Sequence, residues 1–94
     1  MELKEVQTTV RELARSFRRI ARIIEAEEHY NAFICRSADD CWSYPGADEK
    51  YEMYMDKMSA SDERLELLRD AQEPLNKAIE ILITLQESLE KLQS

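Results

Sequence analysis

The sequence predicts an all-α protein, a small helical bundle with coiled-coil-like packing. Its 94 residues are enough for one domain. One glycine and two prolines leave too few turn residues for a sandwich or barrel of short strands. Charged residues make up 35% of the chain, above the average of about 25%, and apolar residues recur at helical spacing. Helices with one packed face and one solvated face account for both observations.

The first predicted helix covers about residues 3–35. Apolar side chains recur in it at alternating spacings of 3 and 4, as in helices that pack against each other. These residues are Val6, Val10, Leu13, Phe17, Ile20 and Ile24. Glu27 and Asn31 take the next two places in the pattern. We therefore expect a bend or a change of partner near 27–31, where the apolar stripe moves to Ile23, Tyr30 and Ile34.

A connection is predicted over about residues 36–48. Pro45 presets φ for the second place of a β-turn, and Gly46 accepts the positive φ of the third. This is the chemistry of a type II turn. The only tryptophan, Trp42, lies in the same segment.

The second arm is predicted as two helical segments, about 49–72 and 74–93, kinked or broken at Pro74. A proline inside a helix removes one hydrogen bond and clashes with the preceding turn, at a cost of about 3 kcal/mol. Two rows of apolar residues with a seven-residue repeat predict the packed face. The rows are Leu68, Leu75, Leu82 and Leu89, and Ala71, Ala78, Leu85 and Leu92.

The C-terminal segment is apolar around more of its circumference than one neighbouring helix covers. At 100° per residue, Ile81 and Ile83 lie on opposite flanks, and the apolar arc spans about 200°. The segment therefore needs at least two neighbours, which three helices of one chain or two hairpins from two chains could supply. Because the first helix is longer than either segment around Pro74, part of its apolar face would project without a second copy, and we predict a homo-oligomer, with a dimer favoured.

The composition argues against most catalytic sites. The one glycine, Gly46, cannot form a glycine-rich phosphate loop, and the one histidine, His29, cannot supply a two-histidine metal motif. No stretch approaches the ~20 apolar residues of a membrane span, and the first residues lack the apolar core of a signal peptide. We expect a soluble, cytoplasmic protein with reduced cysteines, no cofactor, no metal and no enzymatic activity.

Arginines line one face of the first helix, nearly opposite its apolar residues. This arginine stripe consists of Arg11, Arg15, Arg18 and Arg22. Guanidinium groups bind both carboxylates and phosphates with two hydrogen bonds. One interpretation is a face that is solvated or neutralised by the chain's own acidic residues, and another is a site for an acidic protein surface. A site for a nucleotide or nucleic acid is disfavoured by the net charge of −7.

The connection offers a second candidate site. Trp42 and Tyr44 have acidic neighbours, and aromatic anchors with a charged rim are typical of binding hot spots. The alternative is that Trp42 folds back over the end of the core. Tyr51, Tyr54, Met55 and Met58 share one helix face, which predicts core packing or a groove for a partner helix.

These features predict a non-catalytic protein-binding module, that is, an adaptor, inhibitor or regulatory subunit. It would act through the arginine stripe, the aromatic and acidic connection, or both; the candidate residues are Arg11, Arg15, Arg18, Arg22, Trp42 and Tyr44. The alternative is an oligomeric binder of a phosphate-bearing ligand, a nucleotide or nucleic acid, through the same arginines. No motif in the sequence identifies a family.

Overall fold

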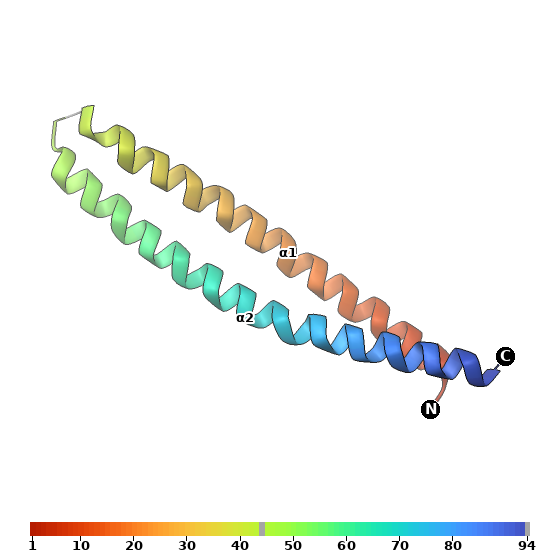
Figure 1. Ribbon diagram of the computed structural model, residues 1–94. Helices are drawn as coiled ribbons and strands as arrows, with labels where there is room; N and C mark the ends of the chain where they lie inside the picture. Colours follow the sequence, from red (N-terminus) through yellow and green to blue (C-terminus); the bar gives the residue numbers. More distant parts are fainter. Residues whose placement is uncertain (44, 94) are drawn as a thin grey trace. The chain divides into compact units, whose positions relative to one another are not determined.

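The computed structural model describes residues 1–43 and 45–93, and this part of the chain is helical without a strand. The helix α1 covers Leu3–Asp40, the short 3-10 helix η1 covers Cys41–Ser43, and α2 covers Ala47–Gln93 (Figure 1). The all-α prediction is therefore confirmed.

Two compact units divide the chain between them. Unit 1 is formed by Met1–Arg22 and Asp70–Ser94, and unit 2 by Ile23–Arg69. In each unit, a stretch of α1 packs against a stretch of α2 that runs in the opposite direction (Figure 1). Each unit is thus an antiparallel pair of helical segments.

Each helix packs against the other with one face, which we call the seam. The residues of this face follow one spacing pattern along the helix. Its residues are buried or half-buried and are spaced alternately by 3 and 4, as in a coiled coil. On α1 the seam contains Leu3, Val6, Val10, Leu13, Phe17, Ile20, Ile24, Glu27, Asn31, Ile34 and Ala38. On α2 it contains Ala47, Tyr51, Tyr54, Met58, Ser61, Leu65, Leu68, Gln72, Leu75, Ile79, Leu82, Gln86 and Leu89.

The predicted sideways shift of the apolar stripe on α1 is wrong. Glu27 and Asn31 keep their places in the seam, whereas Ile23 and Tyr30 are exposed. Ile34 is buried because it belongs to the original pattern, seven residues after Glu27. Polar partners on α2 allow the two polar residues to stay inside.

The connection is shorter than predicted, because both helices extend into the range 36–48. The helix α1 continues to Asp40, since Ala38 falls on the seam and is buried against the core. At the other end, Gly46 has a φ of 75°, as the turn chemistry predicted, and its carbonyl accepts a hydrogen bond from the Lys50 amide (3.2 Å). Gly46 thereby starts α2.

The second arm is one helix rather than two. Pro74 lies inside α2, which continues through it to Gln93. Pro74 itself is exposed, while Gln72 and Leu75 on either side of it lie in the seam. Packing of these neighbours on both sides of the proline holds the helical conformation despite the lost hydrogen bond.

The predicted packed face of the C-terminal segment is half correct. Leu68, Leu75, Leu82 and Leu89 lie in the seam, as expected. The other four residues do not: Gln72, Ile79 and Gln86 take the second set of seam places, one residue further along the helix. These three residues continue the alternating spacing of 3 and 4 to which Ser61 and Leu65 belong in unit 2. As a result, Ala71, Ala78, Leu85 and Leu92 lie beside the seam.

Candidate protein-binding surfaces

The arginine stripe lies in unit 1 on α1, and all four of its residues are exposed. Among residues 1–43 and 45–93, none of the four has a carboxylate within ion-pair distance. A shallow surface hollow borders the N-terminal end of the stripe, lined in part by Lys4, Gln7 and Arg11 of α1 and Gln93 of α2. The interpretation without a partner was a solvated face or one neutralised by the chain's own acidic residues; the neutralisation is not observed within residues 1–43 and 45–93, whereas a solvated face agrees with the exposure of all four.

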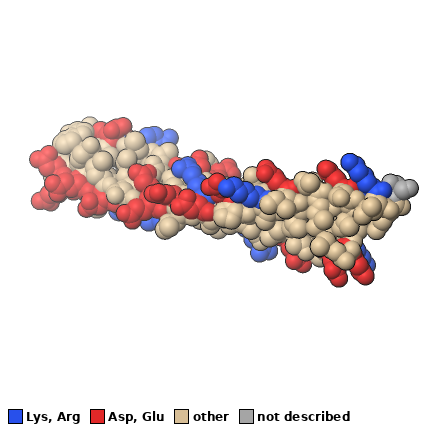
Figure 2. All heavy atoms as spheres, turned by 60° about the horizontal axis from the view of Figure 1, so that its bottom comes forward, with Lys and Arg blue, Asp and Glu red and all other residues tan. Residues whose placement is uncertain are grey.

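Charge is distributed unequally between the units. Unit 1 contains eight basic and eight acidic residues and is formally neutral. Unit 2 contains five basic and twelve acidic residues, so it carries the whole formal charge of −7. Acidic side chains gather on the face of unit 2 that Figure 2 shows. The stripe is therefore a local group of positive charges on a neutral unit, and unit 2 repels anions.

In the connection, the Trp42 side chain packs partly against the protein and is partly exposed to solvent. Its ring packs against Tyr51 with centroids 5.0 Å apart and planes tilted by 33°, yet the residue is 55% exposed. Beside it, the buried Cys41 thiol donates a long hydrogen bond to the Ala47 carbonyl (3.7 Å). Trp42 thus covers part of the core end and still presents an aromatic surface. The predicted site residue Tyr44 lies outside the described residues.

The predicted tyrosine and methionine face splits into two groups. Tyr51, Tyr54 and Met58 are half-buried in the seam of α2, so packing is their main role. Met53 and Met55 are exposed on the flanks of the same helix. The sequence predicted that Met55 shares one apolar helix face with the tyrosines. The alternating spacing of the seam places Met55 outside that face.

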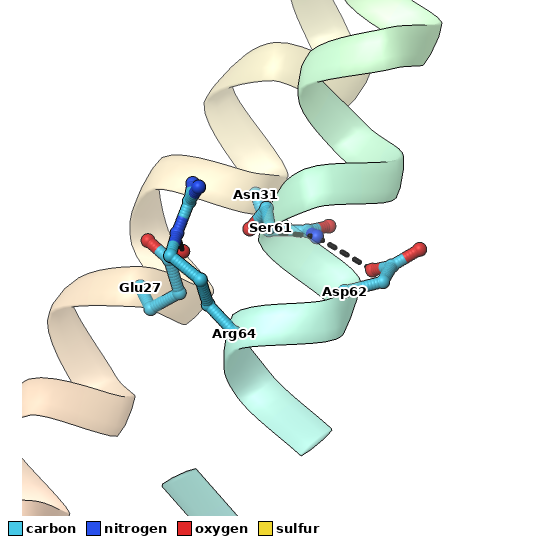
Figure 3. A network of polar contacts seen from close by, with 5 residues as sticks. All are labelled: Glu27, Asn31, Ser61, Asp62 and Arg64. Carbon is cyan, nitrogen blue, oxygen red and sulfur yellow. Dashed lines mark hydrogen bonds and ion pairs between the residues drawn. The ribbon is translucent and has the colours of Figure 1, made fainter. Parts of the chain in front are cut away.

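A polar cluster interrupts the apolar seam of unit 2 (Figure 3). The Asn31 side-chain amide donates to the Ser61 hydroxyl oxygen (3.1 Å) and to a carboxylate oxygen of Asp62 (2.8 Å). Ser61 is fully buried. A buried polar pair of this kind specifies which residues of two helices lie opposite each other, because any shift leaves polar groups without partners.

Next to this pair, Arg64 of α2 makes two contacts with α1. It forms an ion pair with Glu27 (Figure 3), and its guanidinium carbon lies 5.8 Å from the centre of the Tyr30 ring. Further along, Arg69 forms a second ion pair, with Glu28 (3.6 Å). These contacts give Glu27 and Glu28 structural roles in unit 2.

The cluster could have been found in the sequence. Glu27 and Asn31 extend the spacing of the preceding apolar residues without a gap, and Ser61 does the same on α2. A polar residue at a seam place signals a polar partner across the pair. Among residues 1–43 and 45–93, no three His, Cys, Asp or Glu side chains are grouped as a metal site would require. The described helices also lack a segment of the length and apolar content needed to cross a bilayer.

Two exposed isoleucines of unit 1 lie on opposite flanks of α2. Ile81 is 69% exposed and Ile83 39%, while the seam leucines between and around them are half-buried against α1. One neighbouring helix therefore covers only part of the apolar surface of this segment, as its composition predicted.

Comparison of the chain with protein families, with curated proteins and with solved structures gives no match.

Proposed function

We propose that this protein is a non-catalytic binding module, an adaptor, inhibitor or regulatory subunit, that binds an acidic protein surface through the arginine stripe. The observation that carries the proposal is the exposure of four arginines on one helix face without an ion pair to any residue in 1–43 or 45–93. Neighbouring like charges on a helix are mildly unfavourable, so a stripe of this kind costs stability unless an external anion offsets it.

The stripe has the geometry of a docking surface for carboxylates. Arg11 and Arg18 are seven residues apart, as are Arg15 and Arg22, which corresponds to about 10.5 Å along a helix. Each guanidinium group can bind one carboxylate with two parallel hydrogen bonds. An acidic helix or strand laid along α1 would meet all four.

Trp42 supplies a second contact point, in unit 2. Its exposed ring has the size and the amphipathic character of an interface anchor. The two cysteines are free thiols, with Cys35 exposed. Free thiols suit a reducing compartment, so we propose that the module acts in the cytoplasm.

The test is a charge reversal in the stripe with a charge-matched control. Arg15→Glu/Arg22→Glu should abolish partner capture from cells that express the protein, without lowering the melting temperature. Arg36→Glu/Lys57→Glu makes the same charge change on exposed residues of unit 2; it adds to the general repulsion of an acidic partner but removes no arginine of the stripe, so capture should fall much less. If the stripe variant captures the same proteins as the unchanged chain, the proposal is wrong.

A phosphate-bearing ligand is the second candidate, because the same unpaired guanidinium groups bind phosphate equally well. It predicts binding of a short single-stranded DNA that weakens steeply between about 50 and 200 mM salt. Salt-insensitive or absent DNA binding, together with stripe-dependent capture of a protein, would decide in favour of the acidic protein surface.

A further inference from the structure

A second row of residues runs along α2 in unit 1, beside the seam. Its members repeat the alternating spacing of 3 and 4 and are Ala71, Pro74, Ala78, Ile81, Leu85, Ser88 and Leu92. We call this the outer row. Ile81 is 69% exposed and Leu92 81%, while Ala78 and Leu85 are half-buried. This spacing is typical of a face that packs against another helix. In the single chain, however, the centre and the end of the outer row are exposed to solvent.

The outer row is complementary to itself when reversed. If two copies of α2 run antiparallel and cross at Ile81, Leu85 of one copy lies within one residue, about 1.5 Å along the axis, of the level of Ala78 of the other. In the same register, Ser88 lies level with Pro74, and Leu92 lies within one residue of the level of Ala71. Each leucine therefore meets an alanine. Alternation of large and small side chains is what lets two helix faces interdigitate without voids.

The neighbouring row of polar residues suits the same arrangement. Asp70, Lys77, Thr84 and Lys91 form the next row outward at seven-residue spacing. In the antiparallel register, Asp70 of one copy lies within one residue of the level of Lys91 of the other, and Lys77 lies within one residue of the level of Thr84. Unit 1 is formally neutral, so two copies of it meet without net repulsion, whereas two copies of unit 2 would bring together a charge of −7 each.

The exposed area of the chain is large enough to supply such an interface. A folded monomeric protein of 11.1 kDa typically exposes about 5,700 Å². This chain exposes 7158 Å². The difference of about 1,500 Å² is spread over the whole chain, and it agrees with a chain that loses roughly 800 Å² to a partner.

From these observations we propose that the outer row is a homodimer interface, in which α2 of two copies packs antiparallel about a two-fold axis at Ile81. The contact is isologous, since the same patch is used by both copies. It leaves the arginine stripe uncovered, because the stripe lies on α1. The dimer is therefore independent of the proposed function, and either can fail without the other.

The first experiment measures the mass of the full chain by light scattering and analytical ultracentrifugation. We expect a dimer, twice the 11.1 kDa of one chain. Ile81→Glu/Leu92→Glu should raise the dimer dissociation constant at least about tenfold, since both side chains are exposed in the single chain and lose only the intermolecular contact. Ile83→Glu places one glutamate on the opposite flank, and it should leave the dimer intact, whereas Ile81→Glu alone should weaken it. Circular dichroism of each variant checks that helicity is retained.

The second experiment tests the register. In a chain with Cys35→Ser and Cys41→Ala, a cysteine replacing Ile81 should form an intermolecular disulfide under mild oxidation, because residues at a two-fold axis lie within disulfide distance of their copies. A cysteine replacing Ile83 should cross-link at least about tenfold more slowly. The proposal is overturned if the unchanged chain is a monomer at about 100 µM, if Ile83→Glu disrupts the dimer as strongly as the outer-row variant, or if the two cysteines cross-link equally.

Discussion

Asn31 of α1 donates a hydrogen bond to the hydroxyl oxygen of Ser61 on α2, 3.1 Å away, at a place in the seam where solvent does not reach the serine. The pair gives unit 2 a polar layer between apolar ones. Such a layer contributes less to stability than a leucine pair would, but it penalises every misaligned arrangement of the two helices.

Removal of one partner in this layer should destabilise the protein. Asn31→Leu leaves the Ser61 hydroxyl without its partner on α1, at an expected cost of about 1–3 kcal/mol in the free energy of unfolding. Replacement of both residues, Asn31→Leu with Ser61→Ala, should recover most of that loss because no buried polar group is then left over. Urea unfolding of the two single variants and the double variant measures this as a double-mutant cycle. Equal losses from all three variants would contradict the prediction.

The two inter-helix ion pairs of unit 2 should differ in strength. The Glu27 side chain is 14% exposed and its partner Arg64 51%, while Glu28 and Arg69 are 52% and 59% exposed. Exposed pairs contribute little because water and salt screen them. Glu27→Gln should therefore lower the stability by about 1 kcal/mol, and Glu28→Gln by less than about 0.5 kcal/mol. Thermal unfolding at low and high salt compares them, and a larger loss for Glu28→Gln would count against the assignment.

Replacement of Pro74 should stabilise the protein. Pro74→Ala restores an amide to the interior of α2, which can donate to the carbonyl four residues earlier, and it removes the clash of the proline ring with the preceding turn. We expect a gain of about 1–3 kcal/mol, measured by the urea midpoint. Glu73→Ala, at the neighbouring exposed position, serves as the control and should change the stability by less than about 0.5 kcal/mol.

A side chain at position 46 should lower the stability of the protein because of the backbone conformation of Gly46 alone. A Cβ atom built at Gly46 has no atom within 4 Å, so space is available, but the φ of 75° disfavours every L-residue. Gly46→Ala should cost about 1–2 kcal/mol, and Gly46→Asn less, since asparagine adopts this conformation more readily. Differential scanning calorimetry measures both variants. An alanine variant as stable as the glycine chain would show that the turn can change its conformation without loss.

Local chemistry determined most of the secondary structure in advance. The scarcity of glycine and proline excluded a β fold, and the apolar spacing of residues 6–24 predicted the packed face of α1. The pair Pro45 and Gly46 marked the turn, and the exposure of Ile81 and Ile83 agrees with the wide apolar arc predicted from the sequence. Each of these features depends on residues close in the sequence, so it can be read without knowledge of the partner helix.

The exposed positions of the arginine stripe were also predictable, because residues opposite a packed face point to solvent. That the four guanidinium groups have no carboxylate partner within residues 1–43 and 45–93 was not predictable, since this depends on which α2 residues lie nearby. In unit 2, by contrast, two arginines do form ion pairs across the helices: Arg64 with Glu27, and Arg69 with Glu28.

The sequence by itself determined that the chain is helical, where it turns, and which stretches carry an apolar face. Only the tertiary structure decided that Glu27 and Asn31 stay inside the pair, that α2 continues through Pro74, and that Gln72 and Gln86 displace Ala71 and Leu85 from the seam. The physical reason is common to all three. A polar or helix-breaking residue is unfavourable when considered alone, and its cost is offset by contacts with residues that lie far away in the sequence and become neighbours only when the two helices pack.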